Sequence, residues 1–435
     1  MTLNKRAYKG SRDFLPADMR VRDFMFNNMK KTAELFAYEG YDGPLLEEVA
    51  LYKAKSGEEL INDQIYSFTD RGERFVAIRP EMTPTVARMI AGVHKQESKP
   101  IRWYSIPNLL RYEKPQRGRV REHWQFNVDI FGANPNLGEI EVFNLIIKFL
   151  SNFGATKDMF SILINDRRLV DSVFNDLLCL NSEQSYKLYK VIDKAKKVTK
   201  EKLDVLISEI ISEKDKLQIF NDYLALKSFK EVQTFIEKNK INENCSEFFD
   251  FILLVNQLSL KDYISYDPTI VRGLDYYTGI VFEIFDKHPD NNRAIAGGGA
   301  YANLLKIFNE KPLAGFGFGL GDVTLRDFLE SHNLLPDLTK PKNDMLIVYT
   351  QKEAEIDSIN LSNTLRDNGI KTELVLGKIK FNKVFKLAET KGHIRVAVVE
   401  IKESKVHVQV KNTESRENKS FECNKINEII EYIKE

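Results

Sequence analysis

The sequence predicts an α+β fold, in which an antiparallel-sheet domain with a helical insertion is followed by a small α/β domain. Three observations lead to this prediction. Short strand-like segments broken by turn residues dominate the first part, glycine is absent between about 167 and 262, and strands alternate with helices after Pro336 and Pro341. We therefore expect a first domain over 1–335, with the insertion at about 167–262, and a second domain over 343–435.

The elements of the first domain follow from local patterns. Residues 18–39 have the apolar spacing of an amphipathic helix that ends near Gly40. The strand-like segments after it lie at 75–78, 101–106 and 126–131. The turn residues between them favour an antiparallel sheet over βαβ units. Leucine, isoleucine, phenylalanine and lysine at helical spacing predict several successive helices in the insertion, and strand and glycine signals return between 266 and 321.

The second domain shows a regular alternation of strands and helices. The expected strands are 345–349, 371–376, 394–400 and 405–411. The expected helices are 353–368, stopped by Gly369, a second one that runs to about Gly392, and a third from Asn424. This order predicts right-handed crossovers in a small, mostly parallel sheet.

Composition excludes several classes of protein. With 64 basic and 63 acidic residues, the formal net charge of +1 does not indicate a nucleic-acid binder, so any RNA contact must come from local patches. The first ten residues are polar and basic, which argues against a secretory signal, and no apolar run reaches the length of a membrane span. Three scattered cysteines fit a reducing cytoplasm. Histidines lack metal-ligand spacing, so no metal held by protein side chains alone is expected.

The densest polar cluster covers residues 111–132. Arginines at 111, 117, 119 and 121 alternate with carboxylates at 113, 122 and 129, and a loop over 114–119 separates two strand-like stretches. A solvated hairpin with surface ion pairs is one interpretation of such a segment. Phosphate binding is the other, because a guanidinium group donates two parallel hydrogen bonds to phosphate oxygens.

Three further segments combine glycine or proline with polar residues. Arg272-Gly-Leu-Asp-Tyr-Tyr277 is followed by Thr-Gly, and Arg79-Pro-Glu-Met-Thr83 opens an expected helix. The latter could by itself be an ordinary helix start with proline and an acidic first turn. Glycines recur at 297–299 and again at 315–321. The second of these runs contains Gly-x-Gly, but no βαβ unit surrounds it, so a dinucleotide-binding loop is disfavoured.

Together these segments resemble the motifs of class II aminoacyl-tRNA synthetases in their histidyl form. The resemblance covers nearly the whole chain, from 44 to 322 and again in the second domain. It implies a class II antiparallel-sheet catalytic domain and an anticodon-binding domain. The implied activity is a histidine–tRNA ligase that activates L-histidine with ATP and Mg²⁺ and transfers it to tRNA(His). It further implies a cytoplasmic homodimer, whose interface involves the 18–39 helix and the strand before Gly43-Pro44.

The resemblance also implies roles for individual residues. Arg111 and Arg272 are the catalytic residues, which hold the α-phosphate while the histidine carboxylate attacks it. For ATP, Arg111 is joined by Glu113 at the adenine amino group, Arg119 at the outer phosphates and His123 stacked on the base. The implied histidine-binding residues are Glu81, Thr83, Arg111, Gln125, Asp129, Arg272, Tyr276 and Tyr277. A neutral imidazole has one donor and one acceptor nitrogen, which Asp129 and Tyr277 can satisfy.

The chain departs from the family pattern at two glycine-rich motifs. Ala300 and Ala302 replace an arginine and an aspartate in the first, which is expected as a glycine-rich turn. In the second, Asp322 stands where motif 3 has an arginine that meets the γ-phosphate. Arg326, one helical turn later, is a candidate substitute. The alternative is that Arg326 is a surface residue and the loop arginines suffice.

Two lysine clusters are candidates for RNA contact. One, at 378, 380, 383, 386 and 391, lies in the expected anticodon-binding domain, and the other, at 194, 196, 197, 200 and 202, lies in the insertion. Solvated helix faces would explain both equally. Two rival functions remain: a synthetase-like regulatory subunit of histidine biosynthesis, and an amino-acid adenylating enzyme without a tRNA partner.

Overall fold

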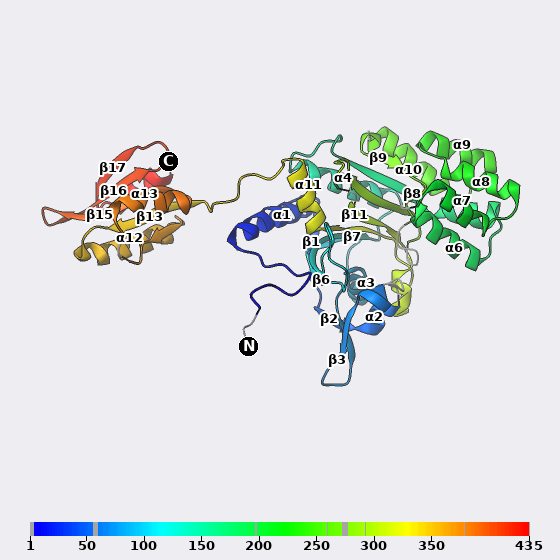
Figure 1. Ribbon diagram of the computed structural model, residues 1–435, viewed down its shortest axis with the longest axis horizontal. Helices are drawn as coiled ribbons and strands as arrows, with labels where there is room; N and C mark the ends of the chain where they lie inside the picture. The colour runs from blue at the N-terminus through cyan, green and yellow to red at the C-terminus, as the bar shows by residue number, and fades with distance from the viewer. Residues whose placement is uncertain are drawn as a thin grey trace. The chain divides into compact units, whose positions relative to one another are not determined.

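The computed structural model describes residues 4–54, 60–195, 198–258, 260–271, 277–291, 293–377 and 379–434. The chain divides into two compact units, residues 1–13 with 22–335 and residues 14–21 with 336–435. Both combine helices with a sheet, so the predicted α+β class is confirmed (Figure 1). Within the described parts of the chain, no helix has the length and apolar character needed to span a bilayer.

The larger unit is built on one large sheet whose strand order is β1-β5-β7-β12-β11-β10-β8-β9. These strands are Glu39–Gly40, Ile101–Ser105, Glu122–Phe131, Gly315–Gly321, Ala294–Tyr301, Ile280–Asp286, Phe160–Asp166 and Ile264–Tyr266. The central pairings are antiparallel, as expected, and the edge pairings β1–β5 and β8–β9 are parallel. A short strand, β6 (Asn108–Leu110), also pairs with β7. The two-stranded hairpin β6–β7 therefore extends from the sheet and carries the arginine-rich loop.

One face of the large sheet is covered by α4 (Leu137–Ser151), which buries an aromatic core. The ring of Phe143 lies 4.9 Å from that of Phe282 on β10 and 5.6 Å from that of Phe316 on β12. Edge-on contacts of this kind are favourable beyond the area they bury. This face of the central strands is therefore occupied by the packing of α4.

The N-terminal part of this unit differs slightly from expectation. The first helix, α1, spans Pro16–Leu35 instead of 18–39, since Ala37 adopts a left-handed φ of 60° and the next residues pair as β1. The other elements here are α2 (Val49–Lys53), α3 (Thr83–Val93) and a small sheet of β2 (Leu46–Glu48), β4 (Phe75–Ile78) and β3 (Tyr66–Thr69).

The helical insertion begins and ends within the expected range. Its helices are α5 (Arg167–Ser172), α6 (Ser182–Asp193), α7 (Lys200–Ser208), α8 (Lys214–Leu224), α9 (Phe229–Asn239) and α10 (Ser246–Gln257). Figure 1 shows α6 to α9 gathered at one end of the large sheet. Helix α6 starts with a capping box, in which Asn181 and Gln184 satisfy each other's backbone N–H groups.

The smaller unit has a mixed sheet, so the expectation of a mostly parallel one is wrong. The order is β14 (Thr372–Leu374), β13 (Asn343–Tyr349), β15 (His393–Lys402), β16 (Lys405–Asn412) and β17 (Asn418–Glu422). The first two pairings are parallel and the last two antiparallel. A two-residue turn with left-handed φ at Glu403 and Ser404 folds β16 back on β15. These residues are not the glycine or asparagine that usually indicate such a turn, so the antiparallel pairing of β15 with β16 was not predicted.

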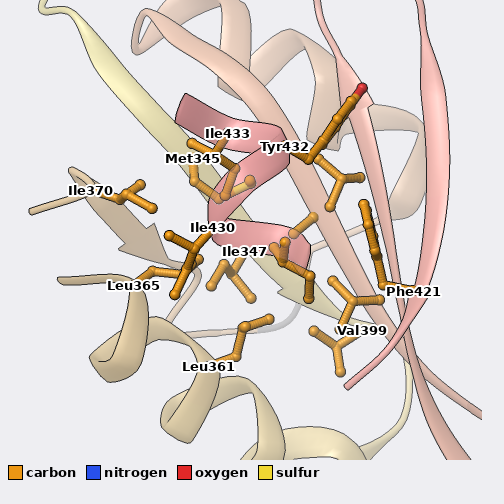
Figure 2. Close-up of a cluster of buried hydrophobic side chains, with 14 of the residues drawn as sticks. Met345, Ile347, Leu361, Leu365, Ile370, Val399, Phe421, Ile430, Tyr432 and Ile433 are labelled. Carbon is orange, nitrogen blue, oxygen red and sulfur yellow. The ribbon is translucent and has the colours of Figure 1, made fainter. Parts of the chain in front are cut away.

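Helices α12 (Glu355–Asp367), α13 (Phe381–Thr390) and α14 (Ile426–Lys434) cover this sheet. Figure 2 shows the core on one face, a buried cluster that contains Met345 and Ile347 of β13 and Ile430 of α14. Each fully buried aliphatic side chain of this kind contributes about 1.5–3 kcal/mol. The unit therefore has a hydrophobic core of its own.

Candidate active site

A cavity of about 680 Å³ opens on the sheet face opposite α4. Strands β7, β10, β11 and β12, the loop between β6 and β7, and the last residues of α6 supply its walls. It brings together Arg111, Glu113, Arg119, His123 and Gln125, which are five of the residues singled out in the sequence. The predicted arginine-rich segment therefore faces a concave, polar site and is not a solvated surface hairpin.

Glycines of two neighbouring strands form part of the cavity floor. Gly297 of β11 and Gly319 of β12 are paired in the sheet, and a Cβ built on Gly319 would lie only 2.6 Å from the amide of Gln125. Close approach to backbone is what glycine permits. The first glycine run was expected to be a turn, and this was wrong: residues 297–299 are the interior of β11, held on both sides by β10 and β12.

Arg111 joins the cavity to the Arg79–Thr83 segment. Its Nε donates a hydrogen bond to the carbonyl oxygen of Pro80 at 2.8 Å. Thr83 is the first residue of α3, so the segment is a helix start as well as a neighbour of the site. Glu81 and Thr83 themselves are not among the residues that line the cavity. Their contact with substrate histidine therefore stays a prediction.

Glu113 and Arg119 bind each other across the loop. The guanidinium group of Arg119 donates to both carboxylate oxygens of Glu113, with Nη2 at 2.6 Å from Oε1. Glu113 is buried, with 8% of its surface exposed. A two-pronged ion pair of this kind is among the stronger polar contacts. The two residues predicted to meet adenine and the outer phosphates are thus engaged with one another.

His123 is neutral over the whole physiological pH range. Burial lowers the pKa of this imidazole to about 3, and the nearby positive charges of Arg111 and Arg12 act in the same direction. An uncharged ring suits a face that stacks on an uncharged base. The position of His123 on the cavity wall is consistent with the predicted adenine contact.

Asp129 lies deeper in the sheet than the cavity wall. It follows Gln125 on the same face of β7, is 6% exposed, and accepts a hydrogen bond from the hydroxyl group of Tyr301. Tyr277 packs nearby, since a Cβ on Gly299 would meet its ring at 2.9 Å. Tyr301 lies two residues after the glycines at 297–299 and was not among the predicted site residues.

Burial also raises the pKa of the Asp129 carboxyl group, to about 7. The native state therefore favours the protonated acid. The contribution of this group to the free energy of unfolding is complete below about pH 4 and is lost as the pH rises to about 7. We expect the midpoint of thermal unfolding of the wild type to fall relative to Asp129→Asn over this interval. The difference corresponds to a free energy on the order of 4 kcal/mol. If the unfolding midpoints of the wild type and Asp129→Asn changed with pH in parallel, this would contradict a raised pKa of the Asp129 carboxyl group.

Asp322 turns away from the cavity. It is 1% exposed and accepts hydrogen bonds from Arg12 Nη2 at 2.8 Å and from the backbone N–H of Trp124 at 2.9 Å. The carboxylate therefore joins the N-terminal segment to β7 and does not face the phosphate site. Arg12 has no motif around it, so no sequence signal pointed to this pair.

Arg326, the candidate substitute for the motif 3 arginine, is paired on the helix surface. Its Nε donates to Glu330 at 2.7 Å along the surface of α11 (Asp322–Ser331), and the residue is not among those that line the cavity. A solvent-facing ion pair between residues four apart on a helix contributes about a few tenths of a kcal/mol to the free energy of unfolding. The substitute proposed from the helical spacing is thus not supported.

Two predicted site residues, Arg272 and Tyr276, lie outside the described residues. The chain that leads to them contributes directly to the site, because Thr269 and Ile270 line the cavity. The roles assigned to Arg272 and Tyr276 stay predictions. Of the predicted lysine clusters, Lys196, Lys197 and Lys378 also lie outside the described residues.

Comparison with known proteins gives two matches that together span most of the chain. A family model described as histidyl-tRNA synthetase matches residues 10–323, and one described as anticodon binding domain matches residues 344–435. The histidine–tRNA ligase of Leptospira biflexa is 42% identical over 90% of this chain and 89% of the relative. That of Thermoplasma volcanium is 37% identical over 83% of each.

Solved structures show the same fold at lower sequence identity. The histidyl-tRNA synthetase of Nostoc sp. superposes with a TM-score of 0.81 and 21% identity over 100% of this chain and 99% of that one. An ATP phosphoribosyltransferase regulatory subunit/histidyl-tRNA synthetase of Bacillus halodurans reaches a TM-score of 0.75 and 21% identity over 92% of this chain and 100% of that one.

Proposed function

The chain belongs to the histidyl-tRNA synthetase family and is a histidine–tRNA ligase, and we propose that both steps of its reaction occur in the cavity described above. In the first step the histidine carboxylate attacks the α-phosphorus of ATP and pyrophosphate leaves. In the second, the terminal ribose hydroxyl group of tRNA(His) takes the histidyl group and AMP leaves. The observation that carries this proposal is the convergence of Arg111, Glu113, Arg119, His123 and Gln125 on one cavity.

We assign the catalytic work to placement and charge neutralisation. Arg111 bridges the attacking carboxylate and the α-phosphate, and Arg272 meets the same phosphate. Hydrogen bonds that strengthen as charge develops on the phosphorus oxygens lower the barrier to the in-line displacement. The contact of Arg111 with Pro80 supports this role, because it fixes the guanidinium plane before substrates arrive.

ATP is held, in this proposal, by residues of the hairpin β6–β7. His123 stacks on adenine, Glu113 accepts from the adenine amino group, and Arg119 binds the outer phosphates. Since Glu113 and Arg119 are paired with each other, nucleotide binding exchanges one ion pair for two substrate contacts. Mg²⁺ enters with the phosphates: within the described ranges no group of three or more acidic, histidine or cysteine side chains could hold it alone.

Histidine is recognised next to the part of the cavity wall that Arg111 and Gln125 form. Glu81 and Thr83 bind its ammonium group, Arg111 its carboxylate, and Gln125, Asp129, Tyr276 and Tyr277 surround the imidazole. A buried acceptor beside hydroxyl groups rejects amino acids that would leave these groups unpaired. The burial of Asp129 next to Tyr301 and Tyr277 supports this arrangement.

The proposed function is tested by two assays on the same preparation. We expect histidine-dependent ATP–pyrophosphate exchange, followed by charging of total tRNA with histidine. Exchange without charging would favour an adenylating enzyme without a tRNA partner. The absence of both would favour a regulatory subunit of histidine biosynthesis, which the similarity to histidine–tRNA ligases already disfavours.

We propose the catalytic domain at 1–335 and the anticodon-binding domain at 343–435. The exposed lysines of the second domain, Lys380, Lys383, Lys386 and Lys391, supply contacts to RNA phosphates. The match of residues 344–435 to anticodon-binding domains supports this assignment.

Truncation after about Leu335 is expected to reduce tRNA charging by roughly 100-fold or more, because several phosphate contacts are lost at once. Adenylate formation, measured by exchange, should change far less. The full-length variant Lys383→Glu/Lys386→Glu provides a control that keeps the domain, and it should lower charging without changing exchange. Equal loss of both activities in a folded protein would contradict the division of labour.

We further propose that the protein acts as a cytoplasmic homodimer. The family resemblance supports the dimer, and so do the exposed apolar residues Leu46, Phe68 and Phe75 on the small sheet β2–β4–β3. Light scattering that gives the mass of a single chain at micromolar concentration would contradict it.

A further inference from the structure

One arginine that the sequence analysis did not single out lines the cavity. Arg293 immediately precedes β11 and also lines a second cavity of about 230 Å³ next to the first. The two cavities share Gly118, Arg293, Ile295 and Thr324 as wall residues. Arg293 is therefore placed on the wall that separates them.

The side chain of Arg293 lies between the arginine-rich loop and α11. A Cβ built on Gly118 would come within 2.9 Å of Arg293 Cδ and 3.5 Å of Thr324 Cγ2. Gly118 also has a φ of 69°, so both the backbone conformation and the space require glycine there. The hydroxyl group of Thr324 donates to the carbonyl oxygen of Ile295 at 3.1 Å, which holds the start of β11 against α11.

Within the described ranges, Arg293 differs from the arginines around it in having no hydrogen-bonding or ion-pairing partner. Arg119 is paired with Glu113, Arg111 donates to Pro80, and Arg117 donates to Asn291. Among the residues that the structure describes, none forms a hydrogen bond or an ion pair with Arg293. Asp286, Asp290 and Asp327 line the smaller cavity without pairing with it. A half-buried guanidinium group without a partner carries a desolvation cost that an anion would offset.

We propose that Arg293 binds the outer phosphates of ATP and the departing pyrophosphate, and so supplies the guanidinium group that position 322 lacks. This inference rests on the proposed function of the cavity. Arg293 touches the loop at Gly118, the residue before Arg119, whereas Arg111 belongs to the α-phosphate end. The two guanidinium groups of Arg119 and Arg293 then hold the polyphosphate from the loop and from the sheet.

The expected effect of Arg293→Ala is specific to the polyphosphate. We expect the KM for ATP and for pyrophosphate to rise roughly 10- to 100-fold, the scale of a lost charge-assisted pair of hydrogen bonds. The Ki of AMP as a competitor of ATP should change less than about twofold, because AMP lacks the outer phosphates. The KM values of Arg293→Lys should fall between those of the wild type and of Arg293→Ala. Lysine keeps the positive charge but lacks the two parallel N–H donors of the guanidinium group.

Arg326→Ala is the matched control, because Arg326 is an arginine on the neighbouring helix that does not line the cavity. It should leave all three constants near those of the wild type. An unchanged ATP KM in Arg293→Ala would overturn the inference, and so would an equal loss of AMP binding, which would place the group at the base or the α-phosphate. If Arg293→Ala unfolds, Arg293→Lys is the deciding variant. Wild-type KM values for ATP and pyrophosphate in Arg293→Lys would overturn the inference. Failure of the proposed function is recognised separately, as a wild-type enzyme without histidine-dependent exchange.

Discussion

Replacing Arg111 with alanine is expected to slow histidine-dependent ATP–pyrophosphate exchange by about 100- to 1,000-fold, the effect of removing one preorganised donor from a transition state. The loss should appear mainly in kcat, because the charge that Arg111 meets grows as the α-phosphorus is attacked. Its guanidinium plane is held by the Pro80 carbonyl oxygen and lies at the cavity wall. Stopped-time exchange assays at saturating histidine and ATP measure this effect.

Arg111→Lys is the informative companion variant. Lysine keeps one positive charge but cannot donate to Pro80 and a phosphate oxygen in one plane. We expect it to recover only a small part of the lost rate. Near-normal kcat in either variant would show that Arg111 does not act in the chemical step.

Asp129→Ala is expected to weaken histidine binding by about 2–4 kcal/mol, which is roughly a 30- to 900-fold rise in the histidine KM. Two causes add up. The substrate imidazole loses its acceptor, and the hydroxyl group of Tyr301 loses the carboxylate to which it donates. The KM for ATP should change little, because Asp129 is not among the residues that line the cavity of about 680 Å³, where ATP is proposed to bind.

Tyr301→Phe separates the two causes. It keeps the carboxylate and removes only the hydroxyl group, so its effect on the histidine KM should be much smaller than that of Asp129→Ala. If Asp129→Ala leaves both the histidine KM and the exchange rate near wild type, the carboxylate does not receive the substrate imidazole. Equal losses in both variants would mean that Tyr301, and not Asp129, makes the decisive contact.

The sequence predicted most of the fold because its signals are local. Apolar periodicity located the insertion, and the break at Pro336 and Pro341 separated two patterns that fold into two units. The hairpin β15–β16 escaped because Glu403 and Ser404 adopt left-handed φ without glycine or asparagine.

The site was predicted only in part because its remaining contacts depend on strand register. Asp129 meets Tyr301 only because β7 pairs with β12 and β12 with β11. Arg12 reaches Asp322 across 310 residues of chain, and Arg293 reaches Gly118 from a different strand. No periodicity encodes such pairs. The spacing that suggested Arg326 correctly predicted a helix there. It did not predict that the Arg326 side chain pairs with Glu330 on the helix surface.

The glycines of β11 and β12 that lie next to the cavity floor also set how much sequence change these strands tolerate. A Cβ on Gly299 would lie 2.6 Å from the carbonyl oxygen of Ile280, and one on Gly317 would lie 2.6 Å from that of Val128. The obstacle in both cases is main chain of the neighbouring strand, which no rotamer change can move aside. Even alanine is therefore excluded there, and compensation would require the strands themselves to separate. These two positions therefore allow a single amino acid.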